Sequence, residues 1–199
     1  MKDFLIHLLA ITIGLLIALA LEATAEWYNH RHLVHEAEDK IAAEINANQQ
    51  ELNKGLPSLR KTEAQLQTFV QLVHQLENNR NTPLNSLDLN WTVMELHETS
   101  WSTAASTGAL GHMSYDEVNR YTRIYGLQHK FDSLQDRAWA SANAVVGLTT
   151  LLDKDANKIT ENELENAERA IGVALANARA EDDVGKILLS GYAGFATSN

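Results

Sequence analysis

The chain has 199 residues, no cysteine and a formal net charge of −10. The lack of cysteine excludes disulfide frameworks, thiolate metal sites and cysteine nucleophiles, and an acidic surface repels phosphate backbones, so we expect no nucleic-acid partner. Only two prolines and ten glycines interrupt the chain, which favours long helices and an all-α fold.

The segment Phe4–Leu21 is predicted to form one membrane-spanning helix. It contains eighteen residues without a formal charge, and at about 1.5 Å per residue it covers roughly 27 Å, close to the hydrocarbon thickness of a bilayer. A cleaved signal peptide is the alternative, because Ala23-Thr24-Ala25 resembles a cleavage site. The apolar run is longer than the ~7–15 residues of a usual signal core, however. We therefore expect a transmembrane anchor over residues 1–26 and a soluble helical domain over residues 27–199.

The charges that flank this segment predict its orientation. The α-amino group and Lys2 stand against Asp3 on its N-terminal side, whereas Glu22 and Glu26 follow it and no basic residue occurs before Arg31. By the positive-inside rule, the N-terminus lies in the cytoplasm. In a bacterium this would place the anchor in the inner membrane as a single-pass helix and the soluble domain in the periplasm.

One face of the anchor carries small residues at four-residue spacing, Ala10, Gly14 and Ala18, and His7 falls on the same face. Such a small-residue face allows close approach of a second helix, from another copy of the chain or from a membrane-protein partner. Chance is the alternative, because small residues are common in membrane helices. For His7 we favour a neutral imidazole that reaches the interface over a haem ligand or proton relay.

Helical periodicity continues beyond the anchor as far as Lys54. Gly55 and Pro57 then predict a helix end and a new start, so that a second helix folds back antiparallel to the first. Asn48 is a polar member of the apolar stripe on the first helix. Buried there, it would fix the register between helices, as asparagine does in coiled coils.

The second half of the chain is also predicted to be helical. Residues 84–100 lack a clear period and are expected to be irregular or to form a short helix, and another short helix is expected over Trp101–Leu110. Two capping boxes open the longer helices, Ser114 with Glu117 and Thr160 with Glu163. The predicted fold is all-α: the N-terminal transmembrane helix continues into a soluble antiparallel bundle of four main helices.

Several runs of sequence resemble an uncharacterised family of bacterial single-pass membrane proteins: LLAITIGLLIALALEATAEW, EAEDKIAAEINANQQEL, WSTAASTGALGHM and VNRYTRIYGLQHKF. In that family a membrane helix with the pattern IGxLIAL runs into a helical domain. The resemblance implies this topology and fold. It implies no activity and assigns no site residues.

The acidic loop before the last long helix resembles an EF-hand calcium loop. Oxygen ligands occur at its first, third and fifth positions, Asp153, Asp155 and Asn157. The sixth position is a lysine instead of glycine, and Glu163 stands at the eleventh position instead of the twelfth. An ordinary acidic loop between helices is therefore the favoured interpretation, and calcium binding stays the alternative.

A second candidate site lies where the first helix leaves the membrane. His32 with Glu36, and His35 with Asp39, share a face at a spacing of four residues and would supply two ligands of a zinc site. A third ligand would have to come from elsewhere in the fold. Solvated histidines are the favoured interpretation, and a pH-sensing role stays the alternative, because imidazole is the side chain that changes charge near physiological pH.

No catalytic constellation or cofactor motif emerges, so we expect a non-enzymatic protein without a cofactor. The first hypothesis is a scaffold or accessory subunit of a membrane assembly, which acts through protein–protein contacts beside the lipid bilayer, as a homo-oligomer or with a membrane-protein partner. The second is an extracytoplasmic sensor or binding module for a small ligand, a metal ion or pH.

Overall fold

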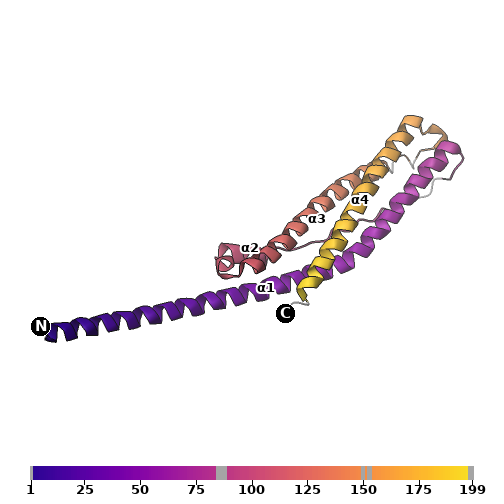
Figure 1. Ribbon diagram of the computed structural model, residues 1–199. Coiled ribbons are helices and arrows are strands. Elements are labelled where there is room, and N and C mark those ends of the chain that lie inside the picture. The colour runs from indigo at the N-terminus through magenta and orange to yellow at the C-terminus, as the bar shows by residue number, and fades with distance from the viewer. Residues whose placement is uncertain (1, 84–88, 149–150, 152–153, 197–199) are drawn as a thin grey trace. The chain divides into compact units, whose positions relative to one another are not determined.

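The computed structural model describes residues 2–83, 89–148, 151 and 154–196. Its α-helices are α1 (Lys2–Asn78), α2 (Thr99–Ser106), α3 (Tyr115–Leu148) and α4 (Glu161–Ala196), with two short 3-10 helices, η1 (Ala109–His112) and η3 (Ala156–Lys158) (Figure 1). The described residues contain no strand, which confirms the predicted all-α class.

The chain packs as two compact units. Unit 1 comprises Met1–Ala43 and Glu98–Asn119, and unit 2 comprises Glu44–His97 and Arg120–Asn199. These units are defined by packing, whereas the predicted boundary after residue 26 concerns a membrane and stays a prediction.

Both predicted capping boxes are confirmed. The Glu117 carboxylate accepts the backbone N–H of Ser114 at 3.0 Å, and the Ser114 hydroxyl accepts the N–H of Glu117 at 3.3 Å. Thr160 and Glu163 repeat this reciprocal pair at 2.9 and 3.3 Å. Each box satisfies N–H groups that a helix start would otherwise leave unpaired, which explains where α3 and α4 begin.

The predicted helix end at Gly55 is wrong, because α1 runs through Gly55 and Pro57 to Asn78 without interruption. A proline inside a helix costs about 3 kcal/mol. Leu52, Leu56 and Leu59 surround it and are at most 2% exposed. Burial of each such side chain contributes about 1.5–3 kcal/mol, so packing outweighs the local preference for a break.

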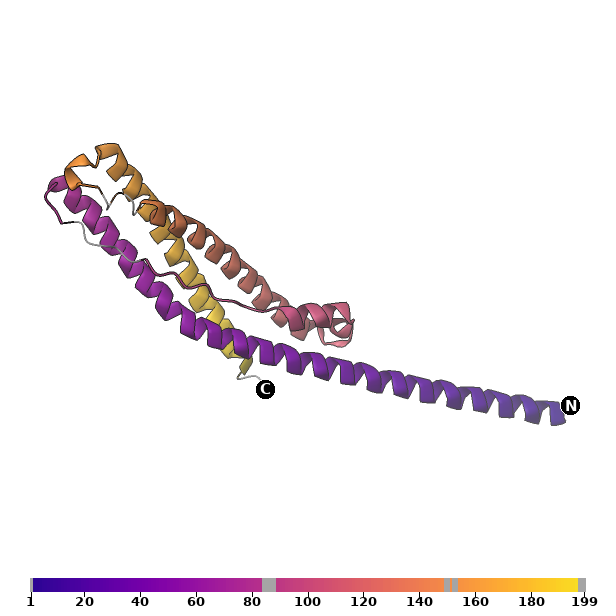
Figure 2. The ribbon, with the colours of Figure 1, turned by 180° about the vertical axis from the view of Figure 1, so that it is seen from behind.

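The antiparallel hairpin predicted at this point is therefore absent, and an extended segment returns the chain instead. We call residues 89–98 the strap; they adopt no helix or strand and run back beside α1 (Figure 2). Along the strap, Asn90 contacts Thr62 and His97 contacts Asn48, so the strap runs opposite to α1.

The same contacts give the directions of the other long helices of unit 2. Met94 of the strap contacts Gln135 of α3, and His97, further along the strap, contacts the earlier residue Gln128. The strap therefore runs opposite to α3 as well as to α1, so α3 is parallel to α1. On α4, Glu168 pairs with His74 and Asp182 with Arg60, in the reverse order, so α4 is antiparallel to α1. The bundle thus has two parallel long helices and one antiparallel helix, instead of the four predicted main helices.

The core of unit 2 consists of one buried stripe from each of these helices. On α4 the predicted closing segment is continuous with the helix before it, and Leu188 and Tyr192 are fully buried. The most deeply buried large side chains of unit 2 are Leu52, Leu56, Leu59, Leu66, Met94, Tyr125, Phe131, Leu188 and Tyr192.

Candidate functional site

The apolar N-terminal segment of α1 lies on the surface. Every residue from Lys2 to Arg31 is exposed, and the large apolar side chains between Phe4 and Leu21 are 48% to 72% exposed. In the part of the chain that the structure describes, α1 is the one helix long and apolar enough to span a membrane. An apolar surface of this size in water is unfavourable, so it needs a covering environment.

The predicted contact residues His7, Ala10, Gly14 and Ala18 all lie on this exposed segment. The Nδ1 of His7 donates a hydrogen bond to the Asp3 carbonyl at 2.7 Å, one turn earlier in the same helix. Nothing described lies within 4 Å of the position that a Gly14 Cβ would take. The small-residue face is thus open, and its predicted role in a helix–helix contact stays a prediction.

Just beyond this segment, aromatic residues mark the end of the apolar surface. Trp27 and Tyr28 are 60% and 67% exposed. The guanidinium carbon of Arg31 stands over the Trp27 ring, 5.5 Å from its centre. Aromatic rings that combine an apolar body with a polar edge prefer the membrane–water interface, as does a neighbouring arginine.

A buried polar network joins the three long helices of unit 2 to the strap. We call it the polar clasp: Asn48 on α1, Gln128 on α3 and Tyr192 on α4, together with the backbone of His97. Asn48 accepts the His97 N–H at 2.8 Å and donates to its carbonyl at 2.7 Å. Gln128 accepts hydrogen bonds from Asn48 at 3.2 Å and from the Tyr192 hydroxyl at 2.6 Å.

The polar clasp confirms that Asn48 is buried among helices, since its exposure is 1%. Burial raises the pKa of the Tyr192 phenol above its usual value, and hydrogen bonding to Asn48 opposes that change. Next to it, the Tyr125 hydroxyl donates to Glu44 at 2.7 Å, and burial followed by this carboxylate raises the pKa of Tyr125. These phenols are held neutral, which suits a structural role and gives neither an acid nor a base near neutral pH.

Two turns further along α3, Gln135 repeats the recognition of the strap backbone. Its side-chain amide accepts the Met94 N–H at 2.7 Å and donates to the Met94 carbonyl at 3.0 Å. The Met94 side chain is 1% exposed and lies against Gly55, where any Cβ would collide with its Cγ and Sδ. Gly55 therefore provides room for the strap instead of ending the helix.

The histidine candidates do not form a metal site in the described structure. His35 faces Asp39 across 3.7 Å, with both side chains at least 70% exposed, and His32 and Glu36 are also exposed. No group of three or more histidine, aspartate or glutamate side chains is arranged to hold a metal among the described residues. The predicted pH or metal function of these four residues stays a prediction.

Other histidines meet different partners. In unit 1 the rings of His30 and His112 stack at 3.7 Å between centres, which attaches η1 to α1. In unit 2 His74 lies 3.0 Å from the Glu168 carboxylate. The two pairs are separate, so these histidines do not complete the site proposed around His32 and His35.

The calcium-loop candidate is described only in part, because Asp153 lies outside the described residues. Asp155 and Asn157 are exposed at η3. Glu163 accepts hydrogen bonds from Lys154 at 2.6 Å and from the Thr160 N–H at 2.9 Å. These contacts, that with Lys154 first, lower the pKa of Glu163 to about 2. Its carboxylate is therefore already engaged in the helix cap, while calcium binding by the whole loop stays a prediction.

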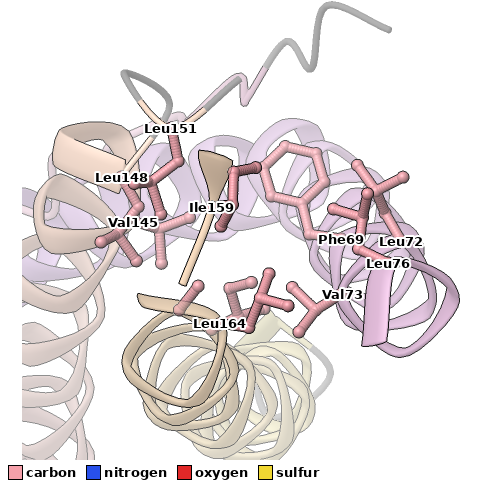
Figure 3. A pocket seen from close by; sticks show the side chains of 11 residues that line it. Phe69, Leu72, Val73, Leu76, Val145, Leu148, Leu151, Ile159 and Leu164 are labelled. Carbon is pink, nitrogen blue, oxygen red and sulfur yellow. The ribbon is translucent and has the colours of Figure 1, made fainter. Parts of the chain in front are cut away.

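A small pocket and a larger groove lie between helices of the described structure. In unit 2 an apolar pocket of about 50 Å³ lies between α1, α3 and α4, and Figure 3 shows Phe69, Val145 and Leu164 pointing into it. This volume is well below the ~300 Å³ of a typical ligand pocket. In unit 1 a groove of about 350 Å³ lies between α1 and α2, lined by Leu33, Glu36, Ala37, Lys40, Thr99, Ser100, Thr103, Ala104 and Thr107.

Sequence reasoning missed the buried polar residues Gln128, Gln135, Glu181 and Asp182, whose exposure is at most 6%. Their positions carried a signal. Gln128 and Gln135 are seven residues apart and continue the stripe of Tyr125, and Glu181 is one turn after Ala178. Polar residues in the register of an apolar stripe indicate buried hydrogen bonding or an unusual ionisable group.

Comparisons of the chain with protein-family models, with curated proteins and with solved structures found no match. Function is therefore argued from the chain's own residues.

Proposed function

We propose that this chain is a non-enzymatic, membrane-anchored helical protein that acts through protein–protein contacts, as a scaffold or accessory subunit of a membrane assembly. The observation that carries the proposal is the exposed apolar segment Phe4–Leu21, with its open small-residue face. A bilayer covers the apolar side chains, and a second helix fits the face formed by Ala10, Gly14 and Ala18.

The proposed location is the inner membrane of a bacterium. The N-terminus lies in the cytoplasm, because Lys2 precedes the span and Glu22 and Glu26 follow it. The predicted soluble domain, residues 27–199, then presents its surfaces in the periplasm. The resemblance to a family of bacterial single-pass membrane proteins supports the same topology, and membership of that family forms part of this proposal.

Extraction of the full chain in a mild detergent, followed by sizing and identification of co-purifying proteins, tests the proposal. We expect a particle larger than one protein copy with its detergent, containing either a second copy or a defined membrane protein. A strict monomer that retains no other protein would refute the assembly role.

A second candidate function is a binding module for a small ligand. The groove between α1 and α2 favours it, because its volume is about 350 Å³ and its lining combines hydroxyl residues of α2 with the charged residues Glu36 and Lys40 of α1. Neither Glu36 nor Lys40 forms a recorded ion pair in the described structure. Calcium, zinc and acidification are the first conditions to test, and an unchanged melting temperature in all three would remove these stimuli as candidates.

A further inference from the structure

One carboxyl group in unit 2 is buried without any partner. Glu181 on α4 is 0% exposed, and neither of its oxygens accepts a hydrogen bond in the described structure. The helices are closely packed around it. One turn later on α4, Gly185 has no side chain, and a Cβ added there would lie 2.6 Å from Leu56 of α1 and 3.0 Å from Phe131 of α3. A buried polar group of this kind requires an explanation.

The charges around Glu181 do not compensate a negative charge on it. Asp182 and Glu63 are the ionised groups that act on it, and both are acidic. The nearby bases are engaged elsewhere: Arg60 bonds Asp182 at 3.1 Å, and Lys186 pairs with Asp182 and with Asp183. Arg179 acts on Glu63, whose Oε1 is also buried without a partner.

The third helix adds no buried charge at this level of the bundle, because its Asp132, Asp136 and Arg137 are not buried. Asn177 of α4 bonds Ser141 of α3 at 3.1 Å, and Gly185 meets Phe131, so Glu181 lies opposite the stretch between these two residues of α3. The buried residues of that stretch are uncharged: Leu134, Gln135 and Ala138. An ionised carboxylate at this position would have neither water nor a cation, which is strongly unfavourable.

We propose that Glu181 is a proton-binding site that makes unit 2 pH-sensitive, with the closed bundle holding this carboxyl group neutral and its ionisation loosening α4 from α1 and α3. This goes beyond the proposed anchoring function and does not depend on it. This geometry raises the pKa of Glu181 to about 8, first through burial and then through the charges of Asp182 and Glu63.

The direction of the pH effect follows from proton linkage. In the unfolded chain a glutamate loses its proton near pH 4.5, the reference value for this group, whereas in the closed bundle Glu181 keeps its proton to about pH 8. The folded state thus binds more protons than the unfolded state between these values. The contribution of Glu181 to stability is greatest below pH 4.5 and is lost as the pH rises towards 8.

Thermal unfolding of the full chain in detergent, followed by circular dichroism between pH 5 and pH 9, tests the proposal. The comparison is between the wild type, Glu181→Gln, which keeps the shape and cannot ionise, and Glu165→Gln, an exposed control on the same helix. We expect the difference in melting temperature, Glu181→Gln minus wild type, to increase by roughly 5–10 °C from pH 5 to pH 8. Glu165→Gln should follow the wild type, and parallel curves for Glu181→Gln and the wild type would overturn the proposal.

A second measurement needs no variant and so does not depend on how Glu181→Gln folds. Carboxyl carbon NMR of the wild type labelled in its glutamate side chains follows each carboxyl group through its titration. One glutamate with a midpoint above pH 7 is the expected result. If all glutamates titrate below pH 6 in the folded chain, Glu181 is ionised at neutral pH and the proposal is wrong.

Discussion

Polar side chains in the core of unit 2 largely serve the backbone of the strap. Asn48 and Gln135 each pair with both the N–H and the carbonyl of one strap residue. Thr62 donates to the carbonyl of Asn90, and Gln128 donates to the His97 carbonyl that Asn48 also contacts. An extended segment that packs on helices has no neighbouring strand to satisfy these groups. Side-chain amides replace that strand, which explains why glutamine and asparagine occupy the centre of an otherwise apolar bundle.

Asn48 is predicted to contribute most among these residues, because it is shared by α1, α3 and the strap. Replacement of Asn48 by alanine removes the partner of the half-buried N–H of His97 and a donor to Gln128. We expect a loss of roughly 2–4 kcal/mol in the free energy of unfolding. Urea unfolding of the full chain in detergent measures this loss.

The matched control is Asn46→Ala, which changes an exposed asparagine on the same helix. Its effect should lie within about 0.5 kcal/mol of zero. Equal effects of the two substitutions would show that the hydrogen bonds of the polar clasp add nothing to stability.

At the scale of elements, the sequence contains strong signals for helix starts and helix faces. The boxes at Ser114 and Thr160 are local, since all their partners lie within four residues, and the structure has both. The end predicted at Gly55 failed because its cause is distant in sequence. Gly55 accommodates Met94, 39 positions later in the numbering, and no local pattern contains that contact.

Gly55 makes room for a packed side chain and Gly172 has open space around it, so substitution by alanine should have opposite effects at the two positions. Gly55→Ala places a methyl group against the Met94 side chain and should destabilise the chain by about 1–3 kcal/mol, despite the better helix propensity of alanine. Gly172→Ala, on α4 with nothing within 4 Å, should instead stabilise it by about 0.5–1 kcal/mol. Thermal unfolding of both variants gives the two signs.

Combination of Gly55→Ala with Met94→Ala identifies the cause. If the collision is responsible, the double variant should lose less stability than the sum of the two single variants, because the smaller side chain makes room for the new methyl group. Strict additivity would mean that Gly55 has some other role.

At the scale of the whole molecule, composition alone indicated the apolar segment, and the exposure of its side chains agrees with a segment that needs a lipid environment. The candidate sites could not be predicted to the same extent. Whether a further histidine reaches His32 and His35 depends on which helices pack together, and in the structure His112 stacks on His30 while His74 lies against Glu168. Spacing along one helix supplies two ligands at most, so the remainder of a metal site cannot be inferred from it.

The orientation of the proposed anchor can be tested with single cysteines, because the chain has none of its own. We expect a membrane-impermeant maleimide to label Glu165→Cys in bacterial cells whose inner membrane is intact and whose outer membrane has been opened. Lys2→Cys should be labelled only after the inner membrane is permeabilised. The reverse pattern would place the N-terminus in the periplasm and residues 27–199 in the cytoplasm.

The most direct test of the proposed function compares two identical substitutions on different faces of the anchor. Ala18→Leu fills the small-residue face, whereas Ala20→Leu makes the same change about 160° around the helix from Ala18. After mild extraction, the wild type and Ala20→Leu should retain a second copy or a membrane-protein partner, and Ala18→Leu should retain at least about tenfold less, a loss of ~1.4 kcal/mol in affinity. Equal retention by both variants, or a wild type that is a strict monomer without any partner, would contradict the proposal.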